Sequence, residues 1–119
     1  MARQRSWPAF ITQMTTMQFD VFPNPVSQAR RAFPWVAALQ SDLADTGRDR
    51  VVAFLALRSS FPVSPGRLMP VVRVNSEECV LLVPSLTNLP AIDLKRAVDN
   101  IGSRRDDIAA ALDYLFLGA

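Results

Sequence analysis

The sequence predicts a mainly β domain of the α+β class, a small antiparallel barrel followed by one C-terminal α-helix. Short apolar stretches of strand length alternate with Pro, Gly and turn residues as far as Val83. From Ile108 onward the apolar residues change to a helical period. The chain has 119 residues, half of them apolar, which suits one core and is too short for two ordinary domains. We therefore expect one domain.

The first strand is predicted directly after Met17. Residues 18–22 alternate in polarity, and Phe19 and Val21 are expected to face inward. Residues 1–16 share no periodicity with the rest of the chain. We therefore place the domain at residues 17–119 and treat residues 1–16 as an N-terminal extension.

The next strands come after a loop that opens with Pro23-Asn24-Pro25, a sequence that ends the first strand. They are predicted at residues 35–39 and 51–57, with a turn at residues 45–47 between them. Residues 51–57 are continuously apolar, which is typical of a central strand covered on both faces.

A hairpin is predicted after the loop at residues 62–66. Its strands are residues 71–74 and 79–83, and the polar stretch 75–78 would be a four-residue connection. Cys79, at the start of the second strand, is expected to be a small buried hydrophobe.

The C-terminal helix has two distinct faces. At about 100° per residue, one face is apolar and expected to be buried: Ile108, Ala111, Leu112, Leu115 and Phe116. The other is expected to be exposed: Ala109, Ala110, Asp113 and Leu117. Ser103 and Asp106 have the spacing of a capping box before this helix.

Charge and composition exclude several classes of function. The net charge of +2 comes from Arg3 and Arg5, because the remaining eleven basic and eleven acidic residues cancel, so we expect no sequence-specific nucleic-acid binding. The chain has no histidine, and no catalytic constellation is visible, so we expect no catalytic residue, metal or cofactor. No apolar stretch is long enough to cross a membrane, and one cysteine excludes an intrachain disulfide. These features predict a cytoplasmic protein without a membrane partner.

From Met17 to Ala119 the chain resembles the CcdB family, the gyrase-poisoning toxins of type II toxin–antitoxin modules. The resemblance rests on Met17-Gln18-Phe19, Gln40-Ser41-Asp42, Asp45-Thr46-Gly47 with Arg50, Pro70-Val71-Val72, Asp107-Ile108 with Ala111, and Phe116-x-Gly118. It implies an SH3-like barrel and a homodimer whose C-terminal helices lie near the two-fold axis. It also implies a toxin that makes and breaks no bonds, and that inserts between the two gyrase A subunits and traps gyrase on cleaved DNA.

The resemblance also implies the site residues. The gyrase-binding positions would be Leu43, Ala44, Asp113, Phe116, Leu117, Gly118 and Ala119. Gyrase-poisoning members typically end in Trp-Gly-Ile, whereas this chain ends in Leu117-Gly118-Ala119. An aliphatic side chain cannot attract a guanidinium as an aromatic ring does, a contribution of roughly 0.5–2 kcal/mol per contact. Three alternatives stay open: weakened poisoning of gyrase, poisoning of another topoisomerase, and loss of poisoning.

The family further implies a cognate antitoxin whose disordered C-terminal tail folds onto the toxin. Candidate anchors for an acidic tail are Arg30, Arg31 and Arg67. One alternative function is therefore antitoxin binding alone, without action on gyrase.

A second alternative is a ribonuclease of the MazF type, which shares the barrel superfamily. Its candidate groups are Arg30 and Arg31 with Ser27, or Arg48 and Arg50 beside Asp45 and Thr46. The cluster Asp42, Asp45 and Asp49 has a composition that could suit Mg²⁺, but turn formation is the simpler explanation of these residues.

Overall fold

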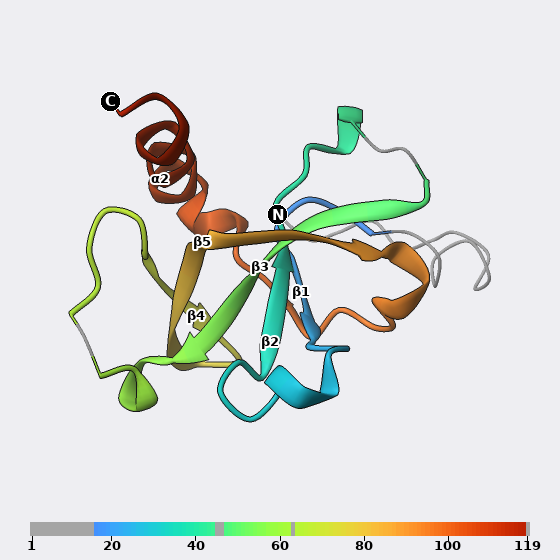
Figure 1. The fold of residues 1–119 in the computed structure, drawn as a ribbon, viewed down its shortest axis with the longest axis horizontal. Coiled ribbons are helices and arrows are strands. Elements are labelled where there is room, and N and C mark those ends of the chain that lie inside the picture. The colour runs from blue at the N-terminus through green and yellow to red at the C-terminus, as the bar shows by residue number, and fades with distance from the viewer. Residues whose placement is uncertain (1–15, 45–46, 63, 119) are drawn as a thin grey trace.

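The computed structural model describes residues 16–44, 47–62 and 64–118, which form an antiparallel, nearly closed barrel-like sheet with one α-helix at its C-terminal end (Figure 1). This confirms the predicted fold class. The strands are β1 (Asp20–Pro23), β2 (Trp35–Ala38), β3 (Asp49–Leu57), β4 (Val71–Val74), β5 (Glu77–Pro90) and β6 (Asp99–Asn100), and the helix is α2 (Arg105–Leu117). Their order in the sheet is β4-β5-β3-β2-β1-β6.

The two edges of this sheet are tied together by a hydrogen bond. The backbone N–H of Asn75, in the turn after β4, donates to Asp99 Oδ2 in β6 at 2.8 Å. This bond links the turn after β4 to β6, the strand at the opposite edge of the sheet.

The core lies on both sides of the central strands. One cluster fills the barrel beneath α2 and includes Phe19, Val21 and Leu55, and a second cluster on the other side includes Phe22 and Val52. Strand β3 contributes buried side chains to both clusters, as its continuous apolar sequence predicts. The inward positions predicted for Phe19 and Val21 are also confirmed.

The first strand is shorter than predicted. Phe19 has φ +71°, so regular pleating begins at Asp20 and residues 17–19 form a turn closed by the bond from Asp20 N to Met17 O (3.0 Å). Alternating polarity reports which side a residue faces, but it does not report this local change of backbone direction.

The β4–β5 connection was predicted as four residues, which is wrong. Asn75 and Ser76 alone make the turn, with φ of +51° and +71°, and Glu77 and Glu78 pair with the end of β4. Two consecutive residues with positive φ are characteristic of the tight turn whose twist matches a hairpin.

Strand β5 is much longer than the predicted 79–83. It pairs along nearly the whole of β3, with a register shift between Val52 and Phe54, and Ser85 Oγ there accepts a hydrogen bond from Phe54 N at 2.9 Å. Strands β2 and β3 lie where they were predicted, and β6 was not predicted. The predicted turn at Asp45-Thr46 lies outside the described residues.

Candidate protein-binding site

Helix α2 is held on the barrel by four apolar side chains. Ile108 and Ala111 are buried, and Leu112 and Leu115 pack partly buried against the barrel cluster. These are four of the five residues predicted for the buried face. Their spacing covers two turns of the helix, which fixes the first part of α2 on the sheet.

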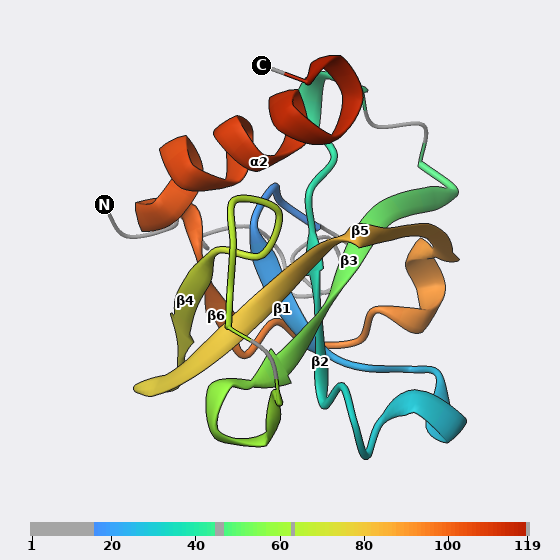
Figure 2. The same cartoon turned by 60° about the vertical axis from the view of Figure 1, so that its left-hand side comes forward.

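The fifth residue, Phe116, was predicted to be buried, and this is wrong because its side chain is 69% exposed. A helix of 13 residues is about 20 Å long, and the C-terminal end of α2 extends away from the sheet (Figure 2). Periodicity gives the direction of a side chain around the helix axis. It does not show whether the sheet reaches that far along the axis.

The start of α2 also differs from the prediction. Arg104 is the N-cap residue and no side chain caps the helix, so Ser103 and Asp106 do not form a capping box. Ser103 lies instead in the 3₁₀ turn η5 (Gly102–Arg104). Asp106 and Asp107 in the first turn complement the helix dipole, and Arg104 Nη2 lies 3.2 Å from Asp107 Oδ2.

The outer face of α2 is exposed as predicted. Ala109, Ala110 and Asp113 are exposed, and the Leu117 side chain is 76% exposed. Gly118 has φ +71° and donates its N–H to Tyr114 O at 3.1 Å, which ends the helix. The last residue, Ala119, lies outside the described residues.

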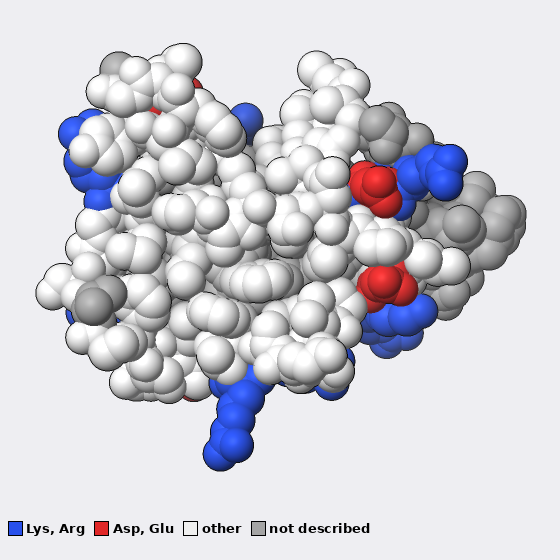
Figure 3. Space-filling model, in the orientation of Figure 1, with Lys and Arg blue, Asp and Glu red and all other residues white. Residues whose placement is uncertain are grey.

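A second apolar projection comes from the 3₁₀ turn η2 (Asp42–Ala44), whose Leu43 is 99% exposed. This turn and the C-terminal end of α2 rise from the same end of the barrel (Figures 1 and 2). The space-filling view shows them as two largely uncharged projections separated by a notch (Figure 3). The fold thus brings Leu43, Phe116 and Leu117 to one end, and we call these three residues the apolar end.

The loop before β4 packs against α2 through Arg67. Its guanidinium carbon lies 4.1 Å from the centre of the Tyr114 ring, a cation–π contact that sequence reasoning missed. Beside it, a cleft of about 270 Å³ is lined by residues that include Arg104 and Asp107. Charged side chains of both signs therefore face this cleft.

The three arginines suggested as antitoxin anchors are not brought together. Arg30 and Arg31 follow the 3₁₀ turn η1 (Ser27–Ala29), and Arg30 Nε donates to Asn24 O at 2.8 Å. Both views place η1 well away from the loop that carries Arg67 (Figures 1 and 2). These arginines therefore do not form a single basic patch.

Of the residues suggested for ribonuclease chemistry, Arg50 lies in the interior of the domain. Arg50 is buried, and its Nη1 donates to Asp49 O at 3.0 Å. The pocket beside Arg50 has a volume of about 10 Å³, room for roughly one water molecule. Asp45 and Thr46 lie outside the described residues.

The Asp42 carboxylate is engaged in a hydrogen bond, and the Cys79 thiol is buried in the core. Asp42 Oδ1 accepts a hydrogen bond from Gln18 N at 2.8 Å, and no group of three His, Cys, Asp or Glu residues in the described ranges could hold a metal ion. Cys79 is buried as predicted, and burial, with the negative charge of Glu77, raises the pKa of its thiol to about 11. At neutral pH this thiol is protonated, whereas the thiolate is the nucleophilic form.

No helix in the described residues is long and apolar enough to span a membrane. A comparison with protein-family models matches the CcdB family, described as CcdB protein, over residues 18–118. The match includes the whole sheet, both segments that carry the apolar end, and α2. The chain therefore belongs to the CcdB family, the toxins of toxin–antitoxin modules that target DNA gyrase.

Proposed function

We propose that this protein binds the DNA gyrase A subunit through the apolar end and traps the complex of gyrase with cleaved DNA. The observation that carries the proposal is the exposure of Leu43 and Leu117 on two projections at one end of the barrel. Large apolar side chains clustered at a protein surface commonly mark a protein-binding site. Family membership indicates gyrase as the target.

The contact would be made by two segments with different roles. Phe116 and Leu117, followed by Gly118 and Ala119, form the part that enters the gyrase A dimer, and Asp113 lies one turn earlier on the same face as Leu117. Leu43 and Ala44 in η2 make the second contact. Two separated contacts would fix the orientation of the toxin on its target.

This mechanism requires binding energy and no covalent chemistry by the toxin. Gyrase itself cleaves the DNA, and the toxin would stabilise the cleaved state by binding it more tightly than the resealed state. The protein is then an inhibitor and not an enzyme. The burial of Arg50 and the small pocket beside it give no support to the ribonuclease alternative.

Leu117 would weaken gyrase trapping relative to a tryptophan at the same position. A leucine side chain still supplies apolar area to the interface, but it lacks the aromatic face that attracts a guanidinium. We therefore expect trapping at higher toxin concentration than an aromatic variant needs.

A cognate antitoxin would neutralise the toxin by folding a disordered tail onto it. Arg67 and Arg104 beside the α2 cleft, and Arg30 and Arg31 beyond η1, are candidate contacts for acidic residues of that tail. Because these regions lie apart, charge reversal at Arg31 and at Arg67 should weaken antitoxin binding independently.

The experiment is a plasmid cleavage assay with purified gyrase from the cognate host. The protein should increase linearised plasmid, Leu117→Ala should reduce this effect, and Leu117→Trp should strengthen it. Ile92→Ala is the matched control, because Ile92 is also a large exposed aliphatic residue, 78% exposed, but lies in the 3₁₀ turn η4 (Ala91–Asp93), outside the proposed contact segments.

If neither the natural protein nor Leu117→Trp produces cleaved complexes, the proposed function is wrong. A homologue that acts on another target, or only binds an antitoxin, would then be the better account.

A further inference from the structure

We propose that Gln40 is a positioning residue for the gyrase contact, because its side-chain amide holds the η2 turn in the orientation that presents Leu43. This inference rests on the proposed function, since it assigns a role within the same binding site. It adds a residue that does not itself lie on the projecting surface.

Core packing cannot hold Leu43 in place. Its side chain is almost fully exposed, and the flanking Asp42 and Ala44 are exposed too. A short turn without buried side chains has little local stability of its own, so its orientation depends on hydrogen bonds to the rest of the domain.

Gln40 connects this turn directly to the central strand. Its Oε1 accepts a hydrogen bond from Val51 N in β3 at 3.0 Å, and its Nε2 donates to Ala44 O at the end of η2. The backbone of Leu39 is paired with the same strand, because Leu39 N donates to Val51 O at 2.9 Å. The Gln40 amide thus links the end of η2 to β3. Only the side-chain amides of Asn and Gln combine a strong acceptor and a strong donor in one planar group.

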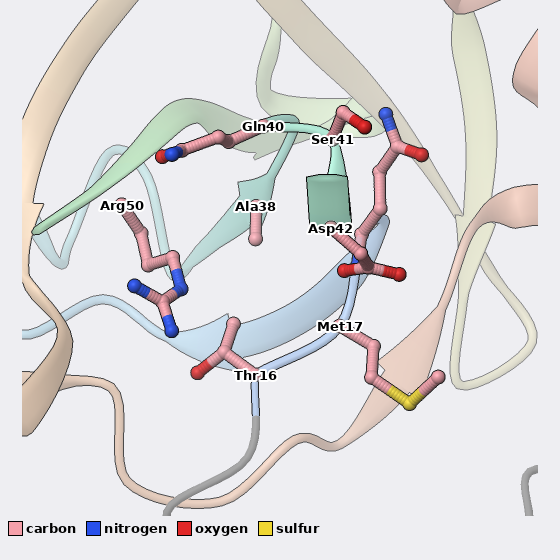
Figure 4. Close-up of a pocket in the computed structure, with 8 residues that line it drawn as sticks. Thr16, Met17, Ala38, Gln40, Ser41, Asp42 and Arg50 are labelled. Carbon is pink, nitrogen blue, oxygen red and sulfur yellow. The ribbon is translucent and has the colours of Figure 1, made fainter. Parts of the chain in front are cut away.

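The side chains of Ser41 and Asp42 make hydrogen bonds at the start of the turn. Leu43 N donates to Ser41 Oγ at 3.1 Å, and Asp42 Oδ1 accepts from Gln18 N at 2.8 Å. Figure 4 shows Gln40, Ser41 and Asp42 leaving consecutive positions in different directions around the small pocket. Asp42 therefore ties the turn to the segment before β1, whereas Gln40 ties it to β3.

The test combines Gln40→Met with Leu43→Ala. Methionine has a similar length to glutamine but lacks its donor and acceptor, so Gln40→Met should weaken binding to purified gyrase A by about three- to tenfold, the effect of one net hydrogen bond. In the Leu43→Ala background the same change should have a clearly smaller effect, because the larger of the two side chains that the turn presents is gone. Gln28→Met in η1 is the matched control, since Gln28 is exposed and lies outside the proposed contact segments.

A second readout requires no partner. Ala44 N donates to Ser41 O at 2.9 Å, and loosening of η2 should raise the exchange rate of the Leu43 and Ala44 amides by about three- to tenfold in Gln40→Met. If Gln40→Met does not fold, Gln40→Glu replaces it, because the carboxylate can still accept from Val51 N but cannot donate to Ala44 O.

The inference is overturned if Gln40→Met leaves both amide exchange and gyrase affinity unchanged, or weakens binding equally in the two backgrounds. Failure of the proposed function has a different signature. In that case Leu43→Ala alone leaves gyrase binding unaltered, while faster exchange in Gln40→Met still supports its hold on the turn.

Discussion

The last turn of α2 exposes Phe116 and Leu117 side by side, and replacing either with alanine should cost the monomer little stability. Each side chain lies mostly outside the core, so we expect a loss below about 0.5 kcal/mol in the free energy of unfolding. Ile108→Ala on the same helix is the contrasting variant. It removes a fully buried side chain and should cost about 2–5 kcal/mol.

Urea unfolding of the three variants, at a chain concentration low enough to keep the protein monomeric, measures these differences. A loss of several kcal/mol for Phe116→Ala would contradict an exposed Phe116. If such a loss disappeared on dilution, Phe116 would lie in an interface between two copies of the chain.

Cys79 should make the protein less stable at high pH. The pKa of its thiol is about 11 in the folded protein against 9.0 for an unperturbed thiol, so the unfolded chain loses this proton first as the pH rises. The contribution of Cys79 to the free energy of unfolding is therefore fully present below about pH 9. It declines as the pH rises toward the folded-state pKa, and about 2 kcal/mol is lost at pH 10.5.

Unfolding of the natural protein and of Cys79→Ala at pH 8 and pH 10.5 isolates this contribution. The decline between the two pH values should be smaller in Cys79→Ala by about 2 kcal/mol. Equal declines would show that the Cys79 thiol does not resist ionisation.

The β4–β5 turn offers a direct way to stabilise one element. Ser76 has φ +71°, a conformation that costs a residue with a side chain about 1–2 kcal/mol and costs glycine much less. Because glycine also increases the entropy of the unfolded chain, Ser76→Gly should give a net gain of about 0.5–1 kcal/mol. Ser59→Gly is the control, because Ser59 lies in the exposed 3₁₀ turn η3 (Arg58–Ser60) and has no positive φ.

Thermal unfolding of Ser76→Gly and Ser59→Gly tests this expectation. A lower melting temperature for Ser76→Gly would mean that the serine makes a compensating contact in the turn.

The elements that were predicted correctly are those whose type and buried face follow from the pattern of apolar residues within the element itself. The continuous apolar run of β3 and the helical period of α2 each specify both the element and the face that it buries. Strand β6 has only two residues, Asp99 and Asn100, and is held by pairing with β1, so no local pattern marks it. Strand β5 continues past Val83 because β3 supplies a partner beyond the register shift.

The candidate site was predicted in part for the same reason. Leu117 lies opposite the buried stripe, and its exposure follows from periodicity alone. The exposure of Phe116 depends on where the sheet ends, and the hydrogen bond between Gln40 and Val51, on which the proposed support of Leu43 rests, spans eleven residues of sequence. Such long-range relations are set by the tertiary fold.

At the scale of the whole molecule, residues 17–119 should fold without the N-terminal extension. The described sheet starts at Asp20, and Met17 is already held by the bond from its N–H to Asp20 Oδ2 at 3.1 Å. A variant that begins at Met17 should therefore keep a melting temperature within about 4 °C of the full chain, equivalent to less than about 1 kcal/mol. A larger decrease would show that residues 1–16 contribute to the folded domain.

The protein should form a homodimer in which the C-terminal helices lie near the two-fold axis. Isolated exposure of Phe116 is unfavourable in water, and a symmetric pairing of two copies would cover part of its side chain while Leu117, on the outer face of α2, stays available to gyrase. Light scattering at micromolar concentration should then give twice the chain mass of 13.2 kDa.

Phe116→Glu should shift the protein toward monomer, because it would place two like charges near the axis, whereas Ile92→Glu in η4 should not. A monomeric natural protein would contradict the homodimer. If Ile92→Glu dissociated the dimer and Phe116→Glu did not, the two copies would meet through the face that carries η4.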